Sequence, residues 1–388
     1  MSIKEEALRK HREWGGKIAT AVRCPLETRE DLSLAYTPGV AEPCLAIQKD
    51  PALSFSLTGR GNTVAVVTDG TAVLGLGDIG PEAGMPVMEG KCALFKAFGG
   101  VDAVPLCIRS KDPDEIVRTV SLLAGSFGGI NLEDISAPRC FEIEHKLQAV
   151  CDIPVFHDDQ HGTAVVVGAA LLGACRLTGR QVADCRCVIN GPGAAGMAIA
   201  RHLLRMGVTD LILCGKEGIL TAEMADEAQA ALLPSVNPRG VTGTLTDALR
   251  GADVFVGVSA GNVVSREMVA VMAPRAILFP MANPIPEISR EEALAGGAYV
   301  VGTGRSDAPN QINNLLAFPG IFRGALDCRA TCINDEMKLA ATHALASLVS
   351  AEELDRDHVI VSPFDPRVAP TVAAAVSEAA RRCGVARK

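Results

Sequence analysis

The sequence predicts an α/β protein of two domains, each built around a parallel sheet. Short apolar stretches alternate with helical stretches from residue 63 onward, a pattern typical of parallel strands joined by helices. A glycine-rich turn at Gly191–Gly196 follows one apolar stretch and precedes a helical one, as in dinucleotide-binding folds. The length of 388 residues fits two domains, or three. We place the boundary at residue 160, so that residues 1–160 form the first domain and residues 161–388 the second.

The first domain is expected to contain strands joined by helices. The strands are expected at 63–68, at 102–108, and in the stretches that end at Glu133 and Phe156. The helices are expected at 84–98, 112–123 and 138–149. Asp112-Pro113 is typical of a helix start, because Asp accepts hydrogen bonds from first-turn amides and proline has no amide hydrogen to leave unpaired.

The second domain is expected to begin with a buried connecting helix at about 162–177, which is apolar on nearly all sides. A second alternating series follows, with strands expected at 186–190, 210–214, 253–258, 276–279 and 298–302. A helical tail is expected from about residue 335 onward, with a break near Pro363–Pro366. This arrangement predicts a Rossmann-type domain with a parallel sheet and a C-terminal helical extension.

Composition and charge exclude several classes of function. The net charge is −8 and no basic run is present, so a nucleic-acid partner is not expected. No apolar run reaches the roughly 18 residues of a membrane span, and the charged first residues do not resemble a signal peptide. The 13 cysteines are scattered without zinc-like spacing. These features predict a cytoplasmic protein with reduced thiols.

Two acidic pairs, Glu133-Asp134 and Asp158-Asp159, each follow a predicted strand. Ligands of open α/β sheets bind where the strands end, so both pairs are expected at a ligand site. Neighbouring carboxylates repel one another, and their hard oxygens suit Mg²⁺ or Mn²⁺. Such pairs also occur as helix N-caps or solvated turns, and a single pair would favour that interpretation. Two pairs in matching positions favour a divalent-cation site.

The glycine-rich turn predicts a dinucleotide site, because it lies between the strand at 186–190 and a helix at about 194–206. The residues expected to approach the cofactor phosphates are Gly191, Pro192, Gly193, Ala194, Ala195 and Gly196. A second match, Gly75–Gly80, is interpreted as a backbone turn beside the site. No helix is expected directly after it, because Pro81 and Pro86 follow.

The end of the second strand of this unit bears on the choice of cofactor. An acidic residue is usual there, but this chain has Cys214-Gly215-Lys216-Glu217. A missing carboxylate with a neighbouring lysine favours a 2′-phosphate and hence NADP. Glu217 could still reach a ribose hydroxyl, so NAD stays open, and Lys216 could also be a solvated turn lysine.

Two further residues are candidates for acid–base chemistry. Tyr36 precedes a Thr-Pro-Gly turn that would hold its phenol, and Lys91 is expected near the start of a helix with an apolar face. A lysine near a bound cation is shifted toward its neutral form and can act as a base. Taken alone, each residue could equally be structural.

A set of motifs in order along residues 15–330 resembles the malic enzymes of the short bacterial type. The motifs are Tyr36-Thr-Pro-Gly-Val, Thr68-Asp-Gly, Leu74-Gly-Leu-Gly-Asp-Ile-Gly80, Met88-Glu-Gly-Lys91, Asn131-Leu-Glu-Asp134, Phe156-His-Asp-Asp-Gln-His-Gly-Thr163, Ala282-Asn283-Pro284, Asn310-Gln-Ile-Asn-Asn314 and Phe318-Pro-Gly. The resemblance implies oxidation and decarboxylation of L-malate to pyruvate and CO₂, with NAD or NADP and a divalent metal. It also implies a homodimer.

The resemblance also implies roles for individual residues. Lys91 would accept the substrate hydroxyl proton and Tyr36 would protonate the enol. The implied metal ligands are Glu133, Asp134 and Asp159, with Asp158 beside them to orient the site. The residues implied to contact cofactor or substrate are Asn283, Asn314 and, as their neighbour, Asn313. His157 and His161 flank the second acidic pair and are expected to form hydrogen bonds there without binding the ion.

One departure from the family pattern affects substrate binding. Larger members have an arginine where this chain has Ala72, so another donor must bind the substrate carboxylate: Thr37, Thr71 or a group of a partner subunit. Two alternative functions stay open. The same residues would serve a malolactic-type enzyme that releases lactate, and a non-catalytic nucleotide-binding protein would keep the fold without needing the full set of reactive residues.

Overall fold

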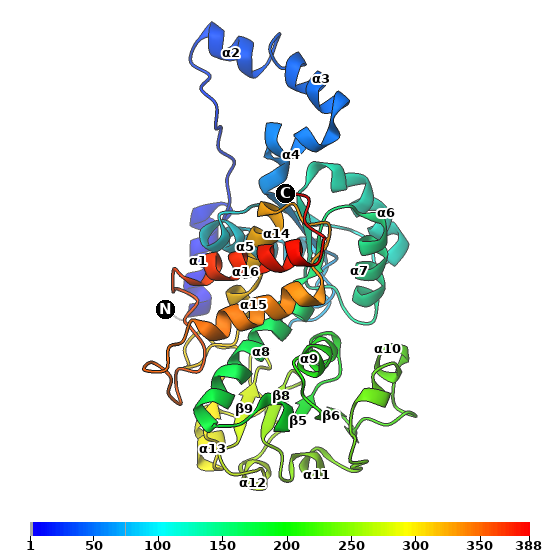
Figure 1. Cartoon of the computed structure of the whole chain (residues 1–388), viewed down its shortest axis with the longest axis vertical. Helices are drawn as coiled ribbons and strands as arrows, with labels where there is room; N and C mark the ends of the chain where they lie inside the picture. Colours follow the sequence, from blue (N-terminus) through cyan, green and yellow to red (C-terminus); the bar gives the residue numbers. More distant parts are fainter. Residues whose placement is uncertain (1–2, 74) are drawn as a thin grey trace.

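The computed structural model describes residues 3–73 and 75–388 and contains two sheets, one in each half of the body (Figure 1). The first sheet has the strand order β2-β1-β3-β4 and is parallel throughout. Its strands are β1 (Thr63–Thr68), β2 (Asp102–Cys107), β3 (Gly129–Leu132) and β4 (Val155–His157). The predicted strands before both acidic pairs are therefore present, as neighbours in one sheet.

Helices cover both faces of this sheet, because alternate residues of β1 point to opposite sides. Val64 and Val66 pack on one face with residues of α5 (Pro81–Gly99), whereas Ala65 and Val67 pack on the other with α6 (Pro113–Leu123) and α7 (Arg139–Val150). The side chain of Asp112 caps α6 by accepting from the amides of Asp114 and Glu115, as the sequence predicts.

The expectation of no helix directly after Gly80 is wrong, since α5 begins at Pro81. Proline is tolerated in the first turn of this helix, because the amide groups of a first turn make no hydrogen bonds within the helix. Pro86 lies inside the same helix without ending it. The Gly75–Gly80 segment is therefore a turn that leads straight into a helix.

The second sheet has the order β10-β9-β8-β5-β6-β7 and is parallel except for β7, which pairs antiparallel with β6. Its strands are β5 (Arg186–Asn190), β6 (Asp210–Gly215), β7 (Gly218–Ile219), β8 (Val254–Gly257), β9 (Ile277–Pro280) and β10 (Val300–Val301). The helices around it are α9 (Ala194–Arg205), α10 (Glu227–Ala230), α11 (Leu245–Leu249), α12 (Arg266–Ala270) and α13 (Arg290–Ala295). The predicted Rossmann-type sheet is thus mixed at one edge only.

Helix α8 (Asp158–Thr178) connects the two halves and is the predicted buried connector. It begins four residues earlier than the sequence predicts, so that Asp158 and Asp159 form its first turn. The reason is that carboxylates are favourable at a helix N-terminus. In the described part of the chain it is the one helix long and apolar enough for a membrane span, and 72% of its apolar window is buried in the protein, as in a core helix.

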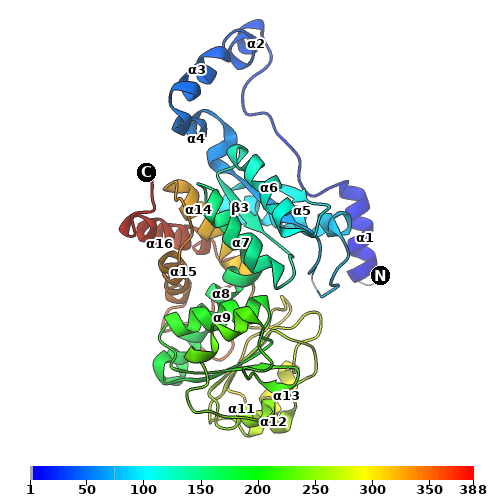
Figure 2. The same cartoon turned by 90° about the vertical axis from the view of Figure 1, so that its right-hand side faces the viewer.

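The C-terminal helices return to the first half of the molecule (Figures 1 and 2). They are α14 (Phe318–Asp327), α15 (Asp335–Ser347) and α16 (Val368–Arg382). Phe318 and Phe322 of α14 pack edge-on against Phe95 of α5, at ring-centroid distances of 4.7 and 5.2 Å. The division at residue 160 therefore describes the two sheets, and the assignment of the last helices to the second domain stays a prediction.

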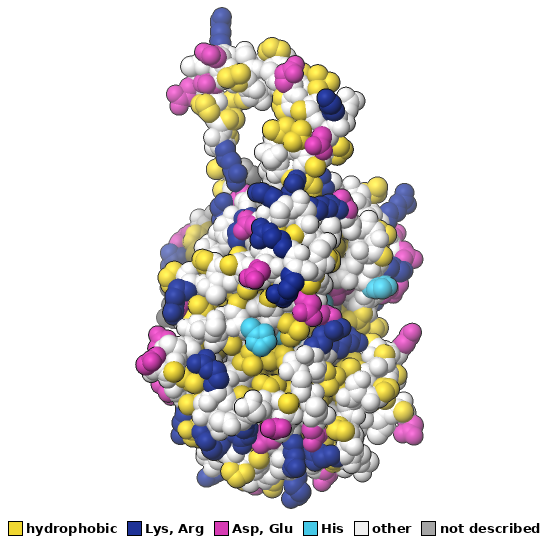
Figure 3. All heavy atoms as spheres, viewed as in Figure 1, with side chains coloured by type: hydrophobic (Ala, Val, Ile, Leu, Met, Phe, Trp, Pro, Cys, Tyr) yellow, Lys and Arg dark blue, Asp and Glu magenta, His cyan; other side chains and the backbone are white. Residues whose placement is uncertain are grey.

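The N-terminal segment forms an extended arm, defined here as residues 19–50 (Figures 1 and 2). Helix α1 (Ile3–Trp14) precedes it, α2 (Arg29–Ala35) and α3 (Ala41–Lys49) belong to it, and α4 (Ser54–Leu57) follows it. None of these helices has a buried residue. Figure 3 shows hydrophobic side chains on the arm surface, apart from the main body.

Candidate functional site

A cluster of acidic side chains lies at the carboxyl edge of the first sheet, where β3 and β4 end. Glu133 and Asp134 directly follow β3, and Asp159 is in the first turn of α8 after β4. One carboxylate oxygen from each of these three residues lies within 4.8 Å of the other two. Such a set of hard oxygens fits a divalent cation such as Mg²⁺ or Mn²⁺.

Asp158 has a different position from the other three acidic residues. Its side chain is fully buried, and its Oδ2 lies 2.5 Å from the Nζ of Lys91. Gly162 makes room for it one turn later in α8, because a Cβ there would come within 1.8 Å of the Asp158 Oδ1. The backbone thus directs Asp158 toward Lys91 and leaves Asp159 with Glu133 and Asp134.

The ammonium group of Lys91 lies between two carboxylates and over an aromatic ring. Its Nζ is 2.8 Å from the Glu133 Oε1 and 4.2 Å from the centre of the Phe318 ring. Burial lowers the pKa of Lys91, but the charges of Asp158, Glu133 and Asp159 outweigh burial and raise it overall. Lys91 is therefore a cation held inside an acidic cluster.

The same cluster raises the pKa values of its carboxyl groups. Burial, followed by the charge of Asp159, raises the pKa of Glu133 well above its usual value, although Lys91 opposes this. Burial also raises the pKa of Asp158 to about 6, again against the effect of Lys91. Carboxylates that resist ionisation in this way would be stabilised by a cation among them.

The segment that carries Glu133 and Asp134 is fixed by local hydrogen bonds. The Asn131 amide donates to the Glu133 Oε2 at 2.9 Å. Asp134 has a left-handed backbone with φ of 52°, and its N–H donates to the Asp159 Oδ2 at 2.8 Å. The carbonyl of Asp134 accepts from the N–H of Ala72 at 3.0 Å. The two segments that follow β1 and β3 are therefore joined directly beside the cluster.

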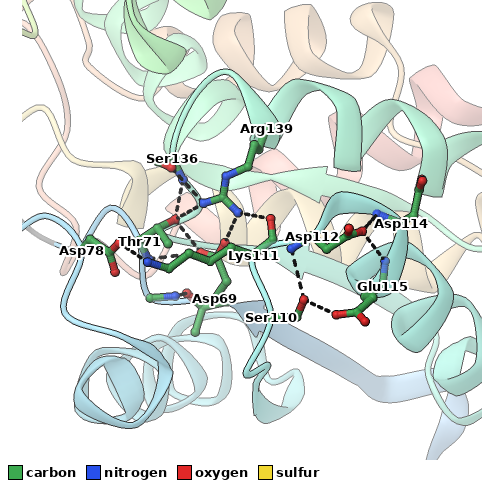
Figure 4. Close-up of polar contacts among 12 residues, drawn as sticks. Asp69, Thr71, Asp78, Ser110, Lys111, Asp112, Asp114, Glu115, Ser136 and Arg139 are labelled. Atoms are coloured by element: carbon green, nitrogen blue, oxygen red, sulfur yellow. Dashed lines mark hydrogen bonds and ion pairs between the residues drawn. The ribbon is translucent and has the colours of Figure 1, made fainter.

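A second connection between these segments is made by Arg139, which the sequence analysis missed (Figure 4). Its guanidinium forms an ion pair with buried Asp69 at 2.9 Å, and donates to the Thr71 hydroxyl at 3.0 Å and the Lys111 carbonyl at 2.6 Å. The Thr71 hydroxyl donates to Asp69 at 2.6 Å and accepts from the N–H of Ser136. Thr71 therefore has no hydroxyl hydrogen left for a substrate carboxylate in this arrangement.

Glu144 is a further buried acid that the sequence analysis missed. Its Oε1 accepts from the N–H of His157 at 3.0 Å, and both its oxygens lie 3.0 Å from the Nε2 of His161. The Nζ of Lys338, on α15, lies 3.4 Å from the Nδ1 of His161. The ring nitrogens of His161 are thus engaged by Glu144 and Lys338. No signal in the sequence distinguishes Glu144 from the other charged residues of α7 (Arg139–Val150), such as Glu142 and Lys146.

The glycine-rich turn has the geometry that a dinucleotide site needs. Gly191 has a φ of 110°, and a Cβ there would come within 2.5 Å of the Val258 carbonyl. Gly196 is equally constrained, because a Cβ there would lie 1.9 Å from the Gly191 carbonyl, whereas Gly193 faces open space at the start of α9. The helix N-terminus is therefore accessible to phosphates.

A pocket of about 510 Å³ adjoins this turn. Gly191 and Pro192 line one side, and Lys216 and Glu217, from the turn between β6 and β7, line another. The Pro192 carbonyl accepts from the side chain of Gln229 at 2.9 Å. Lys216 and Glu217, which the sequence offers as partners of the cofactor 2′-phosphate and ribose hydroxyls, therefore line the same pocket.

Of the three predicted asparagines, Asn283 approaches the first half of the molecule and Asn314 approaches the connecting helix α8. Asn283 lies three residues after β9, and its carbonyl oxygen would be 2.7 Å from a Cβ added at Gly75. The Gly75–Gly80 turn of the first half therefore contacts the half that contains the dinucleotide fold. The Asn314 Cβ would lie 3.2 Å from a Cβ at Gly162 of α8. Asn313 instead caps the following helical turn by accepting from the N–H of Leu315 at 2.9 Å.

Tyr36 is not brought to Lys91 within a single chain. It lies on the arm at the end of α2 and is 68% exposed, whereas Lys91 is 7% exposed in the body. Both views show the arm projecting away from the sheets (Figures 1 and 2). A contact between these two residues therefore requires the arm of another subunit or a different arm position.

Comparison with known proteins identifies both halves. Residues 15–148 match the malic enzyme N-terminal domain and residues 160–381 the malic enzyme NAD binding domain. The chain is 54% identical over 390 residues to a bifunctional malic/malolactic enzyme of Bacillus subtilis (100% of this chain, 95% of the relative) and 55% identical over 378 residues to an NAD-dependent malic enzyme of Geobacillus stearothermophilus (96% and 78%).

NADP-dependent malic enzymes also match, at 46 to 48% identity, and the chain spans about half (51%) of their length. Among solved structures, a malic enzyme of Pyrococcus horikoshii is similar with a TM-score of 0.95 and 47% identity, covering 100% of this chain and 92% of that one.

Proposed function

The chain belongs to the malic enzyme family, and we propose that it oxidises and decarboxylates L-malate to pyruvate and CO₂ with NAD or NADP as hydride acceptor. The observation that carries this proposal is the contact of Lys91 with an acidic cluster at the end of a sheet that meets a dinucleotide fold. A base, a cation site and a hydride-acceptor site in one place are what this reaction needs.

The residues at the carboxyl edge fit a Mg²⁺ or Mn²⁺ ion. Glu133, Asp134 and Asp159 would hold it, because their oxygens already converge and their repulsion would be relieved by it. The bound ion would supply Lewis-acid stabilisation of negative charge on substrate oxygens. Asp158 does not join this set and would instead orient Lys91.

Lys91 is proposed to take the proton from the C2 hydroxyl while hydride leaves C2 for the nicotinamide. Its position over Phe318 and between two carboxylates fixes the Nζ. Asp158 raises the pKa of Lys91 most and stays beside it, whereas Glu133 and Asp159 also raise it and are proposed to hold the cation. A bound cation would weaken the effect of these two carboxylates and favour the neutral amine. Asn314, next to Gly162, and Asn283 would contact the substrate, and Asn283 and Asn313 would contact the cofactor.

We propose that the functional unit is a homodimer in which Tyr36 acts in the active site of the partner subunit. The arm buries none of its residues in its own chain, yet exposes large apolar side chains. These are Val22, Leu26, Leu32, Leu34, Val40 and Leu45. Exposed apolar patches of this kind mark interaction surfaces. The arm would deliver Tyr36 to protonate the enol, and Thr37 beside it to bind the carboxylate left without an arginine at Ala72.

A malolactic activity is the second candidate, favoured by 54% identity to a bifunctional malic/malolactic enzyme. The same residues would oxidise malate, decarboxylate the product and then return the hydride to pyruvate. The structure offers the same cofactor pocket for both outcomes.

A spectrophotometric assay with L-malate and Mn²⁺ tests the proposal, run with NAD and NADP in parallel. We expect metal-dependent reduction of the cofactor with formation of pyruvate. Lactate in place of reduced cofactor would support the malolactic activity. No turnover with either cofactor would leave only a non-catalytic nucleotide-binding protein and contradict the proposal. The pocket beside Lys216 and Glu217 predicts that both cofactors bind, with NADP preferred.

A further inference from the structure

A second pocket lies at the opposite edge of the first sheet from the acidic cluster. Its volume is about 280 Å³. Gly61, Gly128 and Ile153 line it, and they precede β1, β3 and β4. Because these strands are parallel, their amino ends share one edge and the acidic cluster occupies the other. A ligand in this pocket would therefore not contact the proposed metal ligands.

Three arginines line this pocket against a single acid. Arg60, Arg329 and Arg387 contribute positive charge, and Asp152 is the one carboxylate in the lining. The Nη1 of Arg387 lies 3.4 Å from the Asp152 Oδ2. In a chain with a net charge of −8, an excess of positive charge in one cavity is a local feature that needs an explanation.

Arg60 and Arg329 have only neutral partners among the described residues. Arg60 donates to the Phe127 carbonyl at 3.2 Å and to the Ser54 hydroxyl at 2.9 Å. Arg329 donates to the Ala52 carbonyl at 3.4 Å, and its Nε is buried without a hydrogen-bond partner.

The adjoining groove provides a contrast. Its Arg23 pairs with Asp102 at 2.5 Å and its Arg323 with Asp327 at 2.7 Å. Arg329 lines both hollows, and among the described residues Arg60 and Arg329 differ from Arg23 and Arg323 because no carboxylate lies at ion-pair distance from them.

These charges are also held where solvation is reduced. Burial lowers the pKa of Arg60, Asp152 opposes this, and the charge of Arg387 lowers it again. A partly desolvated Arg60 near the charge of Arg387 destabilises the free protein, and an anion in the pocket would relieve that cost. Guanidinium groups bind carboxylate and phosphate oxygens through paired hydrogen bonds, which matches this arrangement.

The walls between the arginines are apolar. The guanidinium of Arg60 lies 4.1 Å from the centre of the Phe55 ring, and Leu326 and Ile153 complete the surface. We propose that this pocket is a second ligand site, which binds a small organic anion through a carboxylate or phosphate group held by Arg60 and Arg329. The pocket lies at the amino ends of the strands, so a ligand bound there would not occupy the proposed malate site at their carboxyl ends.

Isothermal titration calorimetry on the full chain tests this proposal, with succinate and with inorganic phosphate as separate probes. EDTA in the buffer removes the metal through which a dicarboxylate would bind the acidic cluster. We expect one of the probes to bind, and Arg60→Gln and Arg329→Gln each to weaken that binding by at least about tenfold, as the loss of a charge-assisted hydrogen bond predicts. Phosphate binding without succinate binding would identify the phosphate source, and the reverse the carboxylate source.

Arg382→Gln is the matched control, because Arg382 is an exposed arginine in the last turn of α16 and does not line the pocket. It should leave binding unchanged, and thermal melts should show that all three variants are folded. The proposal is wrong if neither anion binds the wild-type chain, or if the two pocket variants bind as tightly as wild type. It is also wrong if the variants alter only the sedimentation coefficient, since the pocket would then hold a side chain of a partner subunit.

Discussion

At the scale of single residues, Lys91 gives the most direct test of the proposed reaction. Lys91→Ala removes the amine that contacts Asp158 and Glu133, and turnover of malate should fall by about 10²- to 10⁴-fold. Binding of reduced cofactor, followed by its fluorescence, should not change, because the dinucleotide pocket is elsewhere. Lys96→Ala is the control, since Lys96 is an exposed lysine on the same helix. Unchanged turnover in Lys91→Ala would remove Lys91 from the role of base.

Asp159 tests the metal site at the same scale. Asp159→Ala removes one of three converging carboxylates, so the Mn²⁺ concentration needed for half-maximal activity should rise by about 10- to 100-fold. The measurement is a Mn²⁺ titration of malate oxidation. Asp184→Ala, at an exposed position outside the cluster, should leave the titration unaltered. If both variants titrate like the wild type, Asp159 is not a ligand.

The residue scale also shows where sequence reasoning ends. Glu133 and Lys91 were identifiable because each belongs to a short motif, although Lys91 lies in the middle of α5 and not near its start as the sequence predicts. Arg139 and Glu144 belong to no such motif, and their partners belong to other elements. Arg139 pairs with Asp69, which follows β1, and Glu144 pairs with His161 of α8. Contacts of this kind depend on how different segments pack together, and a local sequence pattern does not predict that packing.

At the scale of elements, the first turn of α8 depends on Gly162. Gly162→Ala would place a methyl group 1.8 Å from the Asp158 Oδ1, so Asp158 must move away from Lys91. We expect a loss of activity of at least about tenfold and a loss of stability of about 1–3 kcal/mol. Kinetic assays and urea unfolding measure the two effects. Gly125→Ala is the control, because its Cβ meets open space. Full activity in Gly162→Ala would show that the position of Asp158 is not critical.

The packing of α9 against α15 predicts a pH dependence of stability. His202 of α9 is hydrogen-bonded to the Thr342 hydroxyl of α15 at 2.7 Å. Burial, with a smaller effect of Lys338, lowers the pKa of His202 to about 3. The unfolded chain, with a histidine pKa of about 6.5, therefore takes up a proton that the folded chain does not. The stability from this group is complete above pH ~6.5 and is lost as the pH falls toward 3.

Urea unfolding at pH 7.5 and 5.5 measures this effect. His202 should account for about 1.4 kcal/mol of the difference in unfolding free energy between these two pH values. His202→Gln should reduce the pH dependence by that amount, whereas His145→Gln, at an exposed position of α7, should not. Equal pH dependence in His202→Gln and the wild type would contradict a buried neutral His202.

Most elements were predictable because their signals are local. Apolar runs and caps identify β1, β3 and α6, and the glycine-rich turn identifies the start of α9. The start of α8 was placed too late because Asp158 and Asp159 look like a loop in sequence, although acidic side chains stabilise a helix N-terminus. Pro81 was taken as a helix breaker for the converse reason, since proline suits the first turn.

At the scale of the whole molecule, two long-range features determine how the proposed site is completed. Helix α14 returns to the first half and supplies Phe318 beside Lys91, although α14 comes after the strands of the dinucleotide-binding sheet in the chain. The arm leaves its own body and exposes Tyr36. Neither feature has a local signal in the sequence. Together they explain why residues of one proposed site lie far apart in the chain and, for Tyr36, far apart in the fold.

The proposed exchange of arms can be tested by mixing two inactive variants. Tyr36→Phe and Lys91→Ala homodimers should both be inactive. If Tyr36 acts in the partner's site, each mixed dimer has one site with wild-type Lys91 and Tyr36 and one site with both changes. After subunit exchange of an equal mixture, half of the dimers are mixed, so about a quarter of wild-type activity should return.

Two further measurements make the result of this mixing decisive. Sedimentation must show that both variants remain dimers. Mixing Lys91→Ala with Asp159→Ala serves as the control, at a Mn²⁺ concentration that is saturating for the wild type but too low for Asp159→Ala. Lys91 and Asp159 lie in one chain's cluster, so every mixed dimer of that pair has a defect in each site and should stay inactive. If Tyr36→Phe and Lys91→Ala also fail to restore activity despite exchange, each arm must fold back to its own body. The exposed position of Tyr36 would then describe an open form of the chain, and closure of the arm would have to precede protonation of the enol.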